Sequence, residues 1–133
     1  MNERTNSAQR DSSRSALEVA RDYHQAWTRG DLDTAATYIA ADLTTDVPLA
    51  TYADATDFLA GLTRFVQLVS NVELLAELGS SDEAMLLYDI HMNPLGTLRV
   101  AEHFTVANDR ITHIRHVHDT YALRKAGLGT EFP

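Results

Sequence analysis

The most constraining feature of the sequence is a change of hydrophobic period near residue 70. Apolar residues recur at helical spacing before this point, whereas four later runs alternate or are rich in β-forming residues. These runs cover roughly residues 70–78, 84–92, 97–107 and 110–119. The gaps between the runs are short enough for hairpin loops, so we expect an antiparallel meander. Helices followed by strands in one small domain predict an α+β fold, with the helices packed on one face of the sheet.

Three helices are predicted before the change of period. The first covers residues 15–30, where a glycine ends the apolar pattern. The second covers residues 31–42 and the third residues 54–70, each beginning at an aspartate that can cap it. Residues 43–54 combine β-branched residues with a proline, as in a short strand that leads into a loop.

A single domain is expected over residues 14–133. Residues 1–13 are rich in serine, asparagine, arginine and glutamine, and we expect them to form a disordered tail. The sequence has no cysteine, which excludes disulfides, thiolate nucleophiles and cysteine-ligated zinc and makes a cytoplasmic location the expectation. No apolar run is long enough for a membrane span or a secretory signal.

The charge balance points away from polyanionic partners. With 19 acidic and 11 basic side chains, the formal net charge is −8. Such a chain, without a stripe of lysine and arginine, repels phosphate backbones and anionic lipid. We therefore expect no nucleic acid and no membrane among its partners, and a small molecule or a protein instead.

The segment RITHIRHVHDTY, residues 110–121, contains three histidines. If side chains alternate strictly along this strand, Arg115 and Asp119 share one face and His116 and His118 share the other. A metal site at the two histidines would need a further ligand, for which His91 and His103 are available. The alternative, which we favour, places His116 and His118 on the outer face of the sheet and predicts no metal.

Glu102 lies in the middle of an otherwise apolar strand face in the segment LRVAEHFTVAN. A carboxylate at such a position must find a partner or change its ionisation, and carboxylates in apolar clefts are common in acid–base catalysis. Glu102 and Asp119, with Arg115 between them in the sequence, could therefore act as acid, base and charge-tuning group. Alternatively, Arg115 forms an ion pair with Glu102 that only closes the end of the sheet.

Two further pairs are candidate substrate contacts. Asp89 and His91 lie two residues apart on one strand and could set up a general base or simply occupy a solvated strand end. Tyr23 and Trp27 lie one helical turn apart and either line a pocket or belong to the core. Glycine-rich phosphate loops, dinucleotide fingerprints and the Gly-x-Ser-x-Gly elbow are absent, so no cofactor is expected.

The sequence resembles the SnoaL-like branch of the nuclear transport factor 2-like superfamily. The resemblance is carried by the first two predicted helices, by DATDFLAGLTRF, and by the closing segment AEHFTVANDRITHIRHVHDTYALRKAGL. The resemblance implies a cone, in which a strongly curved antiparallel sheet wraps over three helices and encloses an apolar pocket. It also implies a homodimer packed through the outer sheet faces, where Ile114, His116 and His118 would lie.

The same resemblance implies roles for particular residues. Asp119 matches the acid/base aspartate of the SnoaL-like polyketide cyclases, and Glu102 matches the protonated pocket aspartate of the ketosteroid isomerases. Tyr23 lies on the helix that supplies the oxyanion tyrosine of those isomerases. The isomerase base precedes a proline, and here Val47 takes that position, with Asp46 one residue earlier.

The sequence thus predicts a cofactor-independent enzyme that moves protons on a small hydrophobic, cyclic carbonyl compound. In this hypothesis Asp119 is the base, Glu102 a neutral acid or oxyanion donor, and Arg115 tunes their charge. The remaining contacts with substrate come from Tyr23, Trp27, Phe104, Asp89 and His91. The rival hypothesis is a non-catalytic ligand-binding or dimerisation module with the same fold.

Overall fold

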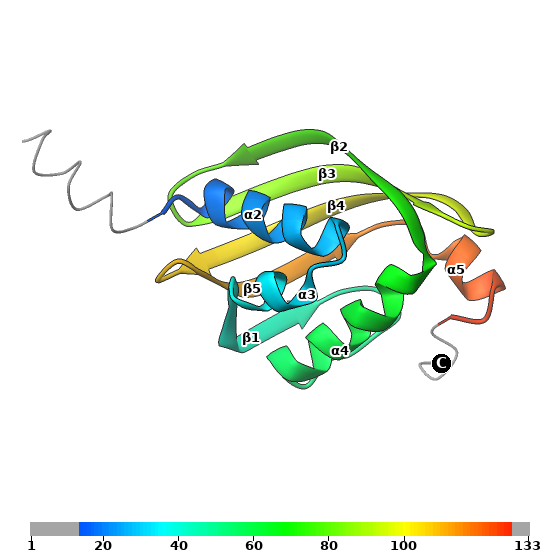
Figure 1. Ribbon diagram of the computed structural model, residues 1–133, viewed down its shortest axis with the longest axis horizontal. Helices are drawn as coiled ribbons and strands as arrows, with labels where there is room; N and C mark the ends of the chain where they lie inside the picture. Colours follow the sequence, from blue (N-terminus) through cyan, green and yellow to red (C-terminus); the bar gives the residue numbers. More distant parts are fainter. Residues whose placement is uncertain (1–13, 129–133) are drawn as a thin grey trace, which may run out of the picture.

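The computed structural model describes residues 14–128, so the predicted tail at residues 1–13 lies outside the described residues. A curved five-stranded sheet wraps around helices on one of its sides (Figure 1). No helix within the described part is both long and apolar enough to span a bilayer. In chain order the elements are α2 (Ala16–Thr28), α3 (Leu32–Ala36), β1 (Ile39–Asp46), α4 (Ala55–Phe65), η1 (Val66–Leu68), β2 (Val69–Gly79), β3 (Glu83–Met92), β4 (Gly96–Ala107), β5 (Arg110–Val117) and α5 (Tyr121–Lys125).

Helix α2 begins with a complete capping box. The Ser15 side chain accepts a hydrogen bond from the Glu18 backbone N–H, and the Glu18 carboxylate accepts one from the Ser15 N–H. These bonds satisfy donors that the first turn of a helix leaves free. The buried stripe of the helix, which includes Val19, Tyr23 and Trp27, packs against the sheet. The sequence prediction for this helix is confirmed.

The predicted α+β class is also confirmed. The strand order is β1-β5-β4-β3-β2, and β2 to β5 form the expected antiparallel meander. The predicted second helix is too long, because α3 ends at Ala36 and β1 begins at Ile39. Strand β1 pairs in parallel with β5, and the Ile111 N–H donates to the Tyr38 carbonyl at 2.8 Å. This long-range pairing outweighs the local helical pattern.

Strand β5 contains a β-bulge that reverses the predicted facing of its second half. Opposite β4, Val106 pairs with Ile111, but the preceding residue Thr105 pairs with His113. One step on β4 therefore spans two residues on β5, and Thr112 is the extra one. An extra residue moves every later side chain to the other face, because side chains on a strand alternate with period two. His116 consequently lies opposite Glu102, on the inner face.

The centre of the core lies where β4 and β5 meet α2. Phe104 is 0% exposed, pairs with Ile114 across the strands, and makes an edge-to-face contact with Tyr23 at a centroid distance of 5.9 Å. Aromatic rings in this arrangement attract each other in addition to the surface they bury. Phe104 was predicted to contact substrate, but it lies beneath Tyr23 as a core residue.

We expect Phe104→Ala to lower the free energy of unfolding by about 3–5 kcal/mol, because it removes a fully buried ring and leaves a cavity. Chemical denaturation followed by circular dichroism measures the effect. Val117→Ala on β5 is the control, since Val117 is 65% exposed and should cost no more than about 0.5 kcal/mol. Equal losses in the two variants would contradict the assigned core.

Candidate active site

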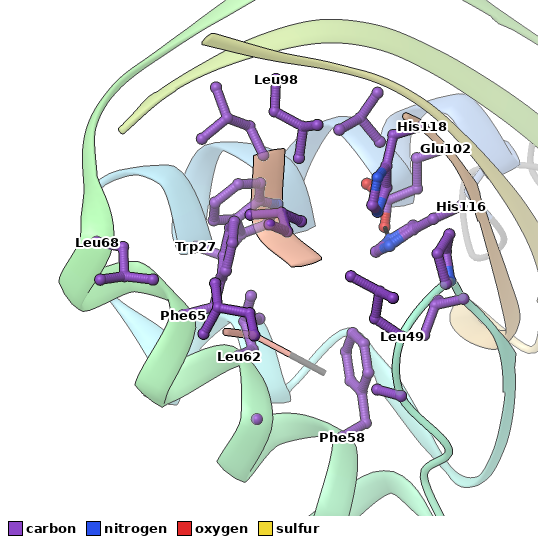
Figure 2. Close-up of a pocket in the computed structure, with 18 of the residues that line it drawn as sticks. Trp27, Leu49, Phe58, Leu62, Phe65, Leu68, Leu98, Glu102, His116 and His118 are labelled. Atoms are coloured by element: carbon purple, nitrogen blue, oxygen red, sulfur yellow. Dashed lines mark hydrogen bonds and ion pairs between the residues drawn. The ribbon is translucent and has the colours of Figure 1, made fainter. Parts of the chain in front are cut away.

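A cavity of about 420 Å³ opens between the inner face of the sheet and the helices. Figure 2 shows Leu62 and Phe65 of α4 and Leu68 of η1 across the cavity from His116, Glu102 and His118. Most of the wall is apolar, and residues 47–50 of the loop after β1 contribute to it. An apolar pocket with a few convergent polar groups is the usual form of a small-molecule site.

The polar part of the wall is a hydrogen-bonded chain across three strands. Glu102 on β4 is only 1% exposed. The Tyr88 hydroxyl, from β3, lies 2.7 Å from Glu102 Oε1, and His116 Nε2, from β5, lies 2.8 Å from Glu102 Oε2 (Figure 2). Both oxygens of this buried carboxyl group therefore have a partner.

The hydrogen bonds among Tyr88, Glu102 and His116 determine which nitrogen of His116 can accept a proton. We place the proton between His116 and Glu102 on the ring nitrogen Nε2, since a carboxylate has no proton to donate. Glu102 then accepts from both neighbours, which differs from the neutral donor that the resemblance implies. With Nε2 committed to Glu102, Nδ1 is the nitrogen through which a neutral His116 can take a proton.

Two tyrosines at the cavity remain hydrogen-bond donors at neutral pH. Burial and then the negative charge of Glu102 hold the pKa of Tyr88 well above 10. Burial, Glu102 and Tyr52, in that order, hold the pKa of Tyr23 well above 10 as well. Tyr23 lines the cavity, so its protonated hydroxyl is suited to bind an oxygen that becomes negative during a reaction.

His118 adds a second imidazole to the cavity wall. Its Nδ1 lies 2.9 Å from the backbone oxygen of Asp119, and a carbonyl can only accept, so Nδ1 carries the proton. The other ring nitrogen, Nε2, is then a proton acceptor. Burial, more than any other cause, lowers the pKa of His118, and the neighbouring His116 lowers it further. Burial therefore favours a neutral His118.

The predicted catalytic group of Asp119, Glu102 and Arg115 is not brought together. Arg115 is exposed on the other face of β5, and its Nε donates to Asp46 at 3.0 Å. Arg115 therefore neither tunes the charge of Glu102 and Asp119 as predicted nor forms the alternative ion pair with Glu102. Asp119 is exposed and accepts a hydrogen bond from the Tyr121 N–H at 3.0 Å, just before α5. The bulge at Thr112 is the physical reason why the predicted facing was wrong.

The predicted contacts at Asp89 and His91 were also misplaced. Asp89 forms two hydrogen bonds with Arg99, at 2.8 and 2.9 Å, and the bond with Arg99 is the main cause of its lowered pKa. His91 lies 2.9 Å from Thr97 on the same outer face of the sheet. By contrast, Tyr23 and Trp27 do line the cavity, and their contact with substrate stays a prediction.

The histidines do not assemble into the metal site weighed from the sequence. His103 pairs with Glu83 at 2.8 Å on the outer face, whereas His116 and His118 face the cavity. Across residues 14–128, no group of three or more His, Cys, Asp or Glu side chains is placed to hold a metal ion. The homodimer stays a prediction, but its interface cannot use the histidines that were assigned to it.

Sequence reasoning missed His116, His118 and Tyr88 as functional candidates. One signal was available in the sequence. Ile111 and Ile114 are three positions apart, and both are fully buried, which strict alternation does not allow. Two large aliphatic residues at this spacing in a strand indicate a bulge between them.

Comparison with known proteins agrees with the fold. A family profile described as SnoaL-like domain matches residues 20–114. The crystal structure of a protein from Kribbella flavida DSM 17836 has 30% sequence identity and a TM-score of 0.81, and the match covers 90% of this chain and 98% of that chain. No curated protein matches the chain significantly.

More distant structures share the fold alone. A nuclear transport factor 2-like protein from Cytophaga hutchinsonii has 13% identity and a TM-score of 0.72, with 84% of this chain and 97% of that chain covered. A protein with a ketosteroid isomerase-like fold from Catenulispora acidiphila, in complex with trimethylamine, has 18% identity and a TM-score of 0.66. That match covers 90% of this chain and 99% of the other.

We expect long-range ¹H–¹⁵N NMR spectra to show His118 as the tautomer with its proton on Nδ1, because that nitrogen faces a carbonyl oxygen. The pKa of His118 should lie below the usual 6.5, because burial penalises the charged ring. His118→Gln assigns the resonances. A proton on Nε2 at neutral pH, or titration above 6.5, would contradict the assignment.

Proposed function

Because the chain belongs to the SnoaL-like domain family of the nuclear transport factor 2-like superfamily, we propose that it is a cofactor-independent enzyme that transfers protons on a small hydrophobic, cyclic carbonyl compound. The fold does not by itself assign a reaction. The observation that carries the proposal is the Tyr88–Glu102–His116 chain, which ends at the wall of an apolar cavity.

His116 is the general base in this proposal. Its Nδ1 takes a proton from the carbon next to the substrate carbonyl, and Glu102 at Nε2 balances the positive charge that the ring acquires. Tyr88 holds the second oxygen of Glu102, so the carboxylate keeps its orientation during the transfer. A carboxylate plays the same orienting part for the histidine in the serine protease triad.

Two further polar groups of the cavity wall, Tyr23 and His118, complete the reaction. Tyr23 donates a hydrogen bond to the carbonyl oxygen as it becomes an enolate, and this stabilisation is strong where water is excluded. A neutral His118 leaves His116 as the one imidazole that becomes charged, which avoids repulsion between the two rings. The proton returns from His116 to the same or another carbon, giving exchange or isomerisation.

His116→Gln should lower the rate of proton exchange by about 10²–10⁴-fold, the usual contribution of a general base. The measurement is ¹H NMR of small cyclic ketones in deuterated buffer, following loss of the signal from the carbons beside the carbonyl. His113→Gln is the matched control, because His113 lies on the same strand, outside the cavity wall, and contacts Thr44 at 2.7 Å. Undiminished exchange in the His116 variant would exclude this residue as the base.

Glu102→Gln should also lower exchange by about 10²-fold or more, because an amide group cannot balance the imidazolium charge and can reverse the tautomer of His116. Ligand affinity, measured by fluorescence of Trp27, should change much less. If wild-type protein binds ketones but exchanges no proton in any of them, the rival assignment of a non-catalytic binding module replaces the enzyme.

A further inference from the structure

One arginine differs from all the others that the structure describes. Within residues 14–128, Arg64 alone among the arginines has a side chain with neither a hydrogen bond nor an ion pair. Four arginines form ion pairs with carboxylates at least eight positions away in the sequence. A fifth contacts an aspartate two positions away. The other two bond a backbone carbonyl and a threonine hydroxyl. In order, the partnered arginines are Arg14, Arg21, Arg99, Arg115, Arg29, Arg110 and Arg124.

Arg64 is also the one arginine that lines the cavity. It lies in the last turn of α4, whose neighbouring turns at residues 60, 61, 67 and 68 carry no acidic side chain. A helix C-terminus favours a nearby cation, which accounts for a basic residue here but not for its place on the cavity wall. Among the arginines of residues 14–128, an arginine side chain with no partner of any kind is therefore the exception.

Arg64 and Glu102, two charged groups of the cavity lining, differ in exposure. Arg64 and Leu128 are the exposed members of the lining, which marks them as the side that opens to solvent. Glu102, with His116, lies at the buried side. The rest of the wall is formed mainly by aliphatic and aromatic residues such as Leu62, Phe65 and Leu98 (Figure 2).

We propose that the substrate is a hydrophobic carboxylic acid, whose carboxylate binds Arg64 at the cavity opening while its apolar body reaches the buried His116 and Glu102. A guanidinium matches the geometry of a carboxylate with two parallel hydrogen bonds. The net charge of −8 disfavours the approach of an anion, and a cation at the cavity opposes this effect locally. This inference rests on the same cavity as the proposed function and adds a requirement for charge.

The test compares two probes of the same shape, 4-cyclohexylbutanoate and 4-cyclohexylbutanamide. Trp27 is the only tryptophan of the chain and lines the cavity, so its fluorescence reports binding. The wild-type protein should bind the acid more tightly than the amide. In Arg64→Gln the affinity for the acid should fall by about three- to fivefold, the effect of a partly solvated ion pair, while the affinity for the amide stays the same.

Arg124→Gln is the control, because Arg124 bonds Thr120 and does not line the cavity, and this variant should keep the wild-type preference. Added salt should reduce the preference of the wild-type protein, since it screens an exposed ion pair. Equal affinity for both probes in the wild-type protein would overturn the proposal. Equal loss of both probes in Arg64→Gln would overturn it as well, because the arginine would then only support the wall.

The outcome is separate from that of the proposed function. Binding of these probes involves no proton transfer. A preference for the acid without any exchange activity would therefore reject the proposed enzyme but support a carboxylate-binding site at Arg64. Conversely, His116-dependent proton exchange on neutral ketones would support the enzyme. If the affinity for the acid is then unchanged in Arg64→Gln, the substrate needs no carboxylate.

Discussion

The arrangement of this protein depends on one buried carboxyl group. Glu102 lies on the inner face of the central strand β4, between the apolar residues Val100 and Phe104. A carboxylate in such a place is strongly unfavourable unless hydrogen-bond donors replace the water it has lost. The two donors come from the strands on either side, Tyr88 on β3 and His116 on β5. The chain of hydrogen bonds therefore links three strands at the point where the sheet lines the cavity.

The bulge in β5 is the backbone feature that makes this linkage possible. Without the extra residue Thr112, strict alternation would place Arg115 on the inner face, and His116 would point away from Glu102. The bulge also allows Ile111 and Ile114 to be buried together, so the apolar core favours the same register as the polar site. Packing and chemistry thus select one arrangement of the strand.

The sequence predicted those features that local patterns determine. The aspartate caps of α3 and α4 and the meander from β2 to β5 follow from spacing and residue type. The burial of Glu102 followed from the alternation of β4. The end of the second helix did not, because the pairing of β1 with β5 joins residues far apart in the sequence. The prediction of the sheet face on which His116 and His118 lie was wrong for a related reason. One unrecognised extra residue moves every later side chain of the strand to the opposite face.

The chain places its charged groups on the two faces of the sheet in different ways. On the outer face, pairs such as Asp89 with Arg99 and Asp46 with Arg115 are at least partly exposed, where ion pairs contribute little to stability. On the inner face, Glu102 and His116 are held together in an apolar wall, where a hydrophobic pair of similar volume is often at least as stable. Stability alone therefore does not account for the inner pair, and the proposed function gives it a role in proton transfer.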